Sequence, residues 1–572
     1  MSAKQSSSHF RKKLRRRLEA AQGRVPCDLL IRDVQYLDVF SARFRRGDIA
    51  VKDGVIVGLE PGLKAKRTIE GRGKWVVPGF IDAHVHLESS LMLPPYFEAA
   101  VLPKGTTTAI CDPHELANVV GPKGIQYFLD SADRLTMDLW VMMSSCVPAT
   151  HLETNGGGAI EATALTKLGR HPRALGLAEM MNIPGVLAAD PKILAKLVGF
   201  SGRPIDGHSP LLRGQALSAY AASGITSCHE SSELEEAREK LTKGISVWIR
   251  EGSVAKDLEA LLPVLDLGSS SSVGFCTDDR NPLDIAEEGH VDHLVRKAMR
   301  LGVAPEVTYR SASWTVARHY GLDRVAPNRE RIGAIAPGYG ADFILLSDLK
   351  SCAVAEAFKS GRLASEIPRA QAVKADLRNT LRARTPHARD LEGPAGQVHV
   401  MEVLAGKIIT ERSVDAHDAS GVARISVLER YGHGRRPANA YVRGFGGSLR
   451  GAIASSVGHD SHNLIVVGDK LESMRTALAA LIESGGGFCV ARDQEVLSRL
   501  PLPFGGLMSE RTPAELKHSL VDLKAASRAI GCELVEPFLQ LAFLSLPVIP
   551  SLKLTDRGLV DVDQFKLISV RA

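Results

Sequence analysis

Eight short apolar segments follow one another between residues 76 and 280, and stretches with helical spacing separate them. Alternation of strand and helix is typical of a parallel sheet, because a helix carries the chain back to the start of the next strand. Almost every segment ends in a histidine, an acidic residue or a serine. In chain order these ends read DAHVH, CDPHE, SSCVP, AEMMN, DGHSP, SCHE, REGS and CTDDR. Polar residues at eight strand ends predict a (β/α)8 barrel, because such barrels place their active site there.

A doubly wound open sheet would also alternate strands and helices. Such a sheet would not require polar or ionisable residues at the ends of eight strands. Its dinucleotide-binding form carries GxGxxG directly after the first strand. The first apolar segment instead runs into PGFIDAHVHLESS. We therefore favour the closed barrel.

The first strand end carries two histidines, His84 and His86. Residues two apart on a strand point to the same side, so both imidazoles are aimed at one place. By itself a His-x-His pair is equally consistent with two metal ligands and with two ordinary surface or core histidines. The residues at the other strand ends decide between these interpretations. They add Asp112, His114, Glu115, Glu179, His208, His229, Glu230, Asp278 and Asp279.

Imidazole and carboxylate together suit Zn, Mn, Fe or Ni rather than Ca or Mg alone. Four histidines and two carboxylates are enough to bind two ions, which can share a water and lower its pKa. The strand ends therefore predict hydrolytic attack on a carbon centre.

Shorter alternating strands flank the barrel on both sides. We expect residues 1–25 to form a basic N-terminal extension and residues 26–75 the first part of a small β-domain. The barrel is expected over 76–331, and the second part of the β-domain over 332–395. Residues 396–572 mix strands and helices and are predicted to form an additional C-terminal α/β domain.

Composition narrows the class of protein. With 44% hydrophobic and 24% charged residues the chain is typical of a globular protein, and no apolar run is long enough to span a membrane. The N-terminus has no apolar signal region, and none of the eight cysteines forms a CxxC pair, so we expect a cytoplasmic protein. Much of the formal charge of +6 lies in HFRKKLRRR near the N-terminus. Helical spacing of its apolar residues favours a solvated helix over a nucleic-acid site.

Several of these motifs also resemble one family. PGFIDAHVHLESS, CDPHELANV, GLAEMMNIPGV, DGHSP, SCHE and GFCTDDR are similar to the bacterial adenine deaminases of the amidohydrolase superfamily. RGFGGSLRGAIASSVGHDSHNLIVVG and LPFGGLMS in the C-terminal part fit the same family. The resemblance covers nearly the whole chain beyond the first ~25 residues. It implies an amidohydrolase barrel with a composite β-domain and an adenine-deaminase-type C-terminal domain.

The resemblance also implies a ligand set and a reaction. One metal is expected on His84, His86 and Asp278, and the second on His208 and His229. Glu179 is expected to bridge the two. The implied cofactor is a binuclear divalent centre of Mn or Fe, with Zn as an alternative. The implied enzyme is a metal-dependent aminohydrolase of purine salvage, in which a bridging hydroxide attacks C6 of adenine and gives hypoxanthine and ammonia.

The implied substrate is a small purine base, and we expect a homodimer without nucleic-acid or membrane partners. The alternative function is a binuclear amidohydrolase that acts on a different nitrogen heterocycle or on a cyclic amide.

Two carboxylates are predicted to be catalytic, Asp278 and Glu115. A proton must reach the ring and the leaving amino group, and the metals already occupy Glu179 and Asp278, so Glu115 is the candidate proton carrier. Its alternative role is to cap the helix that starts near Leu116.

Substrate contacts are predicted for His114 and Glu88, although Glu88 could instead cap the helix that follows it. Glu230 is expected to be structural, and Asp278 is preferred to Asp279 as ligand. The cluster His459, Asp460 and His462 stays open between a third metal site, a loop near the barrel mouth and a subunit contact.

Overall fold

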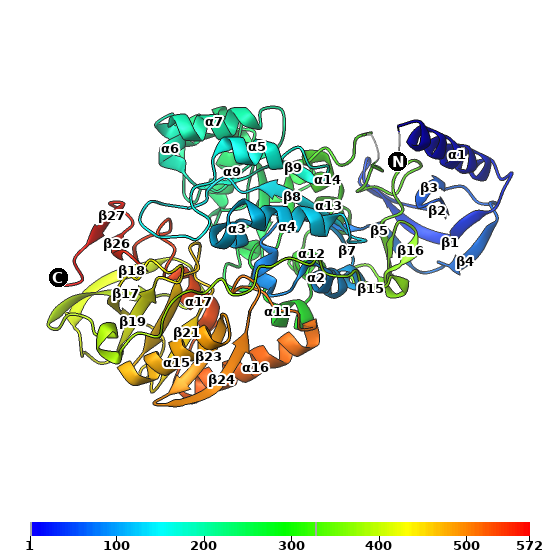
Figure 1. Cartoon of the computed structure of the whole chain (residues 1–572). Coiled ribbons are helices and arrows are strands. Elements are labelled where there is room, and N and C mark those ends of the chain that lie inside the picture. The colour runs from blue at the N-terminus through cyan, green and yellow to red at the C-terminus, as the bar shows by residue number, and fades with distance from the viewer. Residues whose placement is uncertain (1–2, 327–328) are drawn as a thin grey trace.

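The computed structural model describes residues 3–326 and 329–572. Its strands form three large sheets and one small one. In Figure 1 the barrel lies in the middle of the molecule, the N-terminal β-domain at one end and the C-terminal domain at the other. The predicted fold class, a barrel with a composite β-domain and a further C-terminal domain, is confirmed.

The barrel consists of the eight predicted strands in sequence order, each parallel to its neighbours. Strand β13 returns to β6, where the Asp278 N–H donates to the carbonyl of His84 at 3.0 Å and nearly closes the ring. Most residues of these strands are buried, because helices cover the outside and side chains fill the inside. The strands are β6 (Phe80–Val85), β7 (Thr106–Cys111), β8 (Asp138–Met143), β9 (Ala174–Met180), β10 (Ile205–Gly207), β11 (Ser227–Cys228), β12 (Ser246–Arg250) and β13 (Val273–Cys276).

Helices of the barrel lie between these strands and after the last one. They are α2 (Pro94–Val101), α3 (His114–Val120), α4 (Pro122–Ala132), α5 (Ala162–Leu168), α6 (Ile183–Leu187), α7 (Pro191–Gly199), α8 (Gly214–Ala222), α9 (Leu234–Thr242), α10 (Leu258–Leu261), α11 (Pro282–Glu287), α12 (Val291–Arg300), α13 (Pro305–Ser311) and α14 (Trp314–His319).

The β-domain is one eight-stranded sheet built from both sides of the barrel segment. Its strands are β1 (Cys27–Asp38), β2 (Arg43–Lys52), β3 (Val55–Gly58), β4 (Ala65–Glu70), β5 (Trp75–Pro78), β14 (Phe343–Asp348), β15 (Ala353–Lys359) and β16 (Arg362–Leu363). Antiparallel pairing of β14 with β5 joins the two halves, with Ile344 opposite Val77. The return of the chain to this sheet after the barrel is therefore confirmed.

The basic N-terminal tail is helical, as predicted, in α1 (Ala3–Ala21). Arg16 forms an ion pair with Asp53 at 2.9 Å, and Arg17 pairs with Glu330 at 2.7 Å. Part of the positive charge of the tail is thus used to hold the helix on the β-domain.

The C-terminal domain has an eight-stranded, mostly antiparallel sheet with helices packed on it. The elements are β17 (Gln397–Val403), β18 (Thr410–Ala416), β19 (Val422–Leu428), β20 (Ala438–Arg443), β21 (Ala452–Ser455), β22 (Leu464–Gly468), β23 (Gly487–Arg492), β24 (Glu495–Pro501), α15 (Leu471–Glu483), α16 (Pro513–Ala529) and α17 (Pro537–Phe543). A small sheet of β25 (Leu552–Thr555), β26 (Gly558–Asp561) and β27 (Lys566–Ile568) ends the chain.

The segment between the β-domain and the C-terminal sheet does not extend the β-domain. Residues 367–387 contain neither helix nor strand. They run along the C-terminal domain instead, where the Arg382 N–H donates to the carbonyl of Arg430 at 2.7 Å. The last strand of the β-domain is β16.

The C-terminal domain packs against the barrel near its catalytic end. Helix α16 contacts α11, and the side-chain amide of Asn463 donates to the carbonyl of Thr154 at 2.9 Å. The loop of residues 456–463, which joins β21 to β22, is thereby held at the carboxyl ends of the barrel strands. Across the described residues, no helix has the length and apolar character needed to cross a bilayer.

Candidate metal centre and active site

The structure brings all six predicted metal ligands together at the carboxyl end of the barrel. The six come from the ends of five strands, with His84 and His86 both at the end of β6, and five of the six are buried. They are His84, His86, Glu179, His208, His229 and Asp278. The strand ends therefore converge as the sequence pattern predicts.

Glu179 lies between two pairs of histidines. Its Oε1 is 3.2 Å from Nε2 of His86 and 3.8 Å from Nε2 of His84. Its Oε2 is 2.7 Å from Nδ1 of His208 and 3.2 Å from Nε2 of His229. Burial alone would raise the pKa of this carboxyl, but the charges of His208 and His229 outweigh it and hold the pKa well below its usual range.

Asp278 faces the first histidine pair. Its Oδ1 lies 3.1 Å from Nε2 of His86 and 3.5 Å from Nε2 of His84, while Oδ2 lies 3.1 Å from the Arg250 guanidinium. Burial acts to raise the pKa of Asp278, but the adjacent imidazoles and Arg250 hold it well below the ordinary value. Its φ of 54° is unusual for a residue with a side chain, and such strain is common at functional sites.

The preference for Asp278 over Asp279 follows from these contacts. Asp279 receives a hydrogen bond from the Ser89 hydroxyl and belongs to a different group of side chains, with Glu115 and His459.

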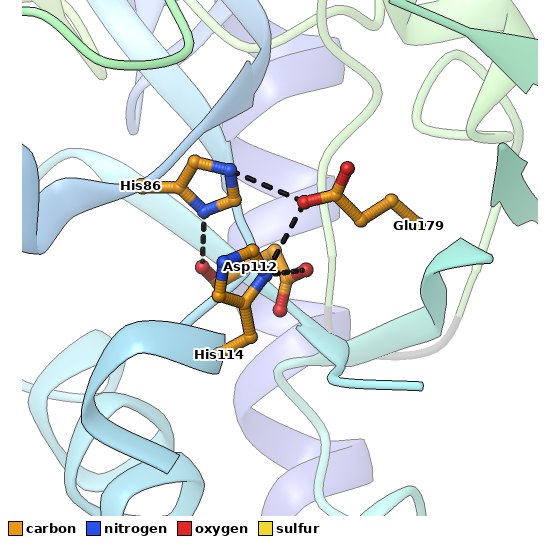
Figure 2. Close-up of side chains that lie close together, drawn as sticks. All are labelled: His86, Asp112, His114 and Glu179. Carbon is orange, nitrogen blue, oxygen red and sulfur yellow. Dashed lines mark hydrogen bonds and ion pairs between the residues drawn. The ribbon is translucent and has the colours of Figure 1, made fainter. Parts of the chain in front are cut away.

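His114 lies inside the metal cluster, as Figure 2 shows. Its Nδ1 is 3.1 Å from Asp112 Oδ2 and 3.2 Å from Glu179 Oε1. Asp112 also orients a predicted ligand, because its backbone carbonyl lies 3.0 Å from Nδ1 of His86. A proton on that Nδ1 leaves the lone pair of Nε2 facing the cluster, which is the usual arrangement around a bound metal. Ser144 completes the network by donating to Asp112 Oδ1 at 2.7 Å.

The donor set fits divalent metal ions. Three groups of imidazole and carboxylate atoms overlap here, and the atoms within each group lie within 4.8 Å of one another. Buried carboxylates and neutral imidazoles are the ligands of Mn, Fe and Zn. We conclude that this centre is built to hold a divalent metal cofactor.

Glu115 lies in the first turn of α3, at the edge of the metal cluster. Its Oε1 is 2.8 Å from Nδ1 of His459 and 3.2 Å from Nε2 of His114. Its Oε2 contacts Nε2 of His462. Burial would raise the pKa of Glu115, but the charges of His459 and His462 reverse this effect and lower the pKa well below its usual value. The His459–His462 cluster therefore lies on a loop at the barrel mouth, and His459 and Asp460 also belong to groups of side chains that could hold a metal ion.

Glu88 is not among the residues that line the cavity next to the cluster, and its contact with substrate stays a prediction. Its Oε1 accepts the backbone N–H of Leu116 at 3.0 Å and caps the first turn of α3. A carboxylate there stabilises the helix N-terminus. Glu88 itself lies in the short turn Leu87–Ser90, and the helix that it caps is α3 rather than α2, the next helix along the chain.

Glu230 forms a two-pronged ion pair with Arg250, with 3.0 Å between its Oε1 and one guanidinium nitrogen. Because the same guanidinium contacts Asp278 and Asp257, Glu230 fixes the side chain that orients a predicted ligand. This agrees with the structural role expected for it.

The cavity beside the cluster has walls from two domains. The barrel contributes most of the metal-cluster residues together with Met181, Glu230 and Arg250. The C-terminal domain contributes an apolar wall, together with His459 and Asp460. This wall consists of Ile408, Phe543, Leu546 and Ile549. Sequence reasoning missed these four residues, because isolated apolar side chains in a domain more than a hundred residues away carry no motif.

Comparison with known proteins gives matches over most of the chain. Residues 75–364 match a family model described as the amidohydrolase family, and residues 402–566 match the adenine deaminase C-terminal domain. A curated adenine deaminase from Cereibacter sphaeroides is 47% identical over 573 residues, which cover 98% of this chain and 100% of the relative. One from Methylobacterium nodulans is 49% identical over 571 residues, covering 97% of this chain and 99% of the relative. One from Sinorhizobium fredii is 46% identical over 570 residues, with the same coverage.

Proposed function

The chain belongs to the adenine deaminase family of metal-dependent amidohydrolases, and we propose that it hydrolyses adenine to hypoxanthine and ammonia. The observation that carries the proposal is the position of Glu179, whose two oxygens face two separate histidine pairs. The adjoining cavity supports it further, because carboxylates that can move protons line it. Replacing an amino group by the oxygen of water needs both features.

We assign the holding of two divalent ions to six side chains, with Glu179 between the ions. When bound, two such ions act as Lewis acids and lower the pKa of water towards neutrality. Mn or Fe is the proposed metal, with Zn as the alternative, because mixed imidazole and carboxylate sites suit these ions. The six are His84, His86, Glu179, His208, His229 and Asp278.

The proton transfers are assigned to two carboxylates. Asp278, held by Arg250, accepts a proton from the attacking water as the new C6–O bond forms. The other hydrogen of the water reaches the neighbouring ring nitrogen through Glu115, and the proton held by Asp278 passes to the amino group, which leaves as ammonia when the C6–N bond breaks. The low pKa of Glu115 favours the ionised carboxylate in the resting site, so it must first collect the proton that it delivers. His114 is assigned to the metal cluster and to contact with Glu115.

A product assay with a panel of purines, other nitrogen heterocycles and cyclic amides tests the function. Protein loaded with Mn or with Fe should release ammonia and hypoxanthine from adenine, and chelator should abolish the activity. Elemental analysis should find up to two transition-metal ions per chain. Full activity in chelator without bound metal would refute the proposal. Turnover of a cyclic amide by ring opening, without adenine turnover, would favour the alternative amidohydrolase function.

The cellular setting is a separate proposal. All eight cysteines are free and buried, which supports a reducing compartment such as the cytoplasm. The substrate is proposed to be a small free base rather than a nucleic acid. A homodimer remains a prediction, which light scattering on the purified protein tests.

A further inference from the structure

We propose that His459 and His462, on the C-terminal loop of residues 456–463, position the Glu115 carboxylate for proton transfer, so that the C-terminal domain completes the active site. The inference rests on the proposed function, because it concerns the carboxylate that carries the proton. It assigns a task to a loop that begins more than 300 residues after Glu115 in the sequence.

The two histidines approach different oxygens of the same carboxylate. Nδ1 of His459 lies 2.8 Å from Oε1, and Nε2 of His462 contacts Oε2. On the barrel side, Nε2 of His114 lies 3.2 Å from Oε1. All four side chains are buried, so water does not compete for these contacts. The Glu115 carboxylate is therefore held by one imidazole of the barrel and by two imidazoles of the C-terminal domain.

The surroundings of Glu115 make such partners necessary. A carboxylate oxygen of Asp279 lies within 4.8 Å of Glu115 and His459, so two carboxyl groups share this buried space. A buried carboxylate without compensating contacts is strongly unfavourable, and repulsion would turn it away. The two C-terminal imidazoles oppose that repulsion and fix the direction of the carboxylate.

His462 is held in one orientation by its own loop. The backbone N–H of Gly458 donates to its Nδ1 at 3.3 Å, so the ring proton of the neutral form resides on Nε2, which faces Glu115. The guanidinium of Arg430 donates to the carbonyl of His462 at 3.2 Å and anchors the backbone.

His459 is held by the end of α17. Its ring stacks on Phe543, with 4.6 Å between ring centres and 8° between the planes. The backbone N–H of His459 donates to the carbonyl of Ala542 at 3.1 Å. The Ser545 hydroxyl donates to the backbone carbonyl of His459, also at 3.1 Å. Both imidazoles thus have fixed positions before any substrate binds, which is what positioning residues require.

Amide substitutions test the contacts atom by atom. The side-chain nitrogen of Asn can take the place of Nδ1 of a histidine, and that of Gln the place of Nε2. His459→Asn should therefore retain more activity than His459→Gln, whereas His462→Gln should retain more than His462→Asn. His459→Ala and His462→Ala should lower kcat for adenine at least roughly tenfold with little change in KM, because general acid–base catalysis is worth about 10²–10⁴-fold. His518→Gln, at an exposed position on α16, is the matched control and should keep normal kcat.

The same variants made in the Glu115→Gln background complete the test. If the histidines act through Glu115, replacing them in the Glu115→Gln protein should lower kcat little further, because the effects of residues that act together on one step are not additive. Metal content should equal that of the unaltered protein in every variant. Equal behaviour of Asn and Gln at both positions, or fully additive losses, would overturn the positioning role. Loss of a third metal equivalent from the histidine variants would replace it with a cation site. Normal turnover of Glu115→Gln would refute the proposed role of Glu115 as proton carrier. If Glu115→Gln is slow but the histidine variants have normal turnover, only the positioning role of the histidines is refuted.

Discussion

At the scale of single residues, the position of Glu179 is fixed by many close neighbours. Glu179 is 2% exposed, and five imidazoles lie within 4 Å of its two oxygens. A carboxylate can serve two cations at once because each oxygen carries its own lone pairs and share of the charge. An amide has one acceptor oxygen and no charge, so it cannot replace the carboxylate in this position.

Glu179→Gln should accordingly lose most of its turnover and at least one metal ion per chain. Elemental analysis and ammonia release on the same preparation measure both. Glu161→Gln, at a solvent-exposed position, is the control and should change neither. Normal metal content together with normal turnover would mean that Glu179 has only a structural role.

Substitution of Glu115, unlike that of Glu179, should lower turnover without loss of bound metal. Glu115→Gln should bind metal and purine normally, yet turn over at least about a hundredfold more slowly, given the usual contribution of acid–base groups. Single-turnover kinetics, adenine binding and elemental analysis separate these effects. A variant with near-normal turnover and a lower melting temperature would identify Glu115 as a helix cap, the role that Glu88 performs for α3.

At the scale of elements, the barrel strands were predictable and the loop of residues 456–463 was not. Each strand is a run of apolar residues followed by polar ones, because a barrel buries the strand and opens its carboxyl end, and that rule is local in sequence. It identified His84, His86, Glu179 and the other ligand candidates. The contact of His459 with Glu115 depends on how two domains pack, and no local pattern encodes that packing. The helix that Glu88 caps was unpredictable for the same reason, since its partner is the N–H of Leu116 in a later helix.

Arg430 supports this loop. The guanidinium is fully buried and donates to the carbonyls of His462 and Gly505, at 3.2 and 2.8 Å, and to the Thr380 hydroxyl at 2.5 Å. The planar guanidinium can reach three separate acceptors, whereas a lysine ammonium presents its donors from one point.

Arg430→Lys should therefore destabilise the protein by about 2 to 4 kcal/mol, the cost of losing one or two hydrogen bonds to a charged group. It should also lower kcat, because the loop it anchors carries His462. Denaturant unfolding and adenine kinetics measure the two effects, with the exposed Arg436→Lys as control. Unchanged stability and kcat would show that the loop holds its shape without this anchor.

At the scale of the whole molecule, the C-terminal domain acts as one wall of the active site. Ile408, Phe543, Leu546 and Ile549 line the cavity opposite the metal cluster, which leaves a confined space between the two domains. The cavity between these walls holds about 30 Å³, so a purine base can enter only when the walls move slightly apart. A base that carries a ribose would require a larger movement of the same walls.

We therefore expect adenine to be deaminated much faster than adenosine, as measured by ammonia release at equal concentrations. Ile549→Ala should raise the KM for adenine by roughly three- to tenfold, because each buried methylene group contributes about 0.8 kcal/mol. The same change should narrow the preference for the base over the nucleoside, because it opens the wall and removes a contact made only by the base. An equivalent truncation at Val198, which is 70% exposed on α7, should change neither KM nor preference. Faster ammonia release from adenosine than from adenine would show that the wall does not enclose the substrate, and the selectivity of the site would then have to come from the barrel alone.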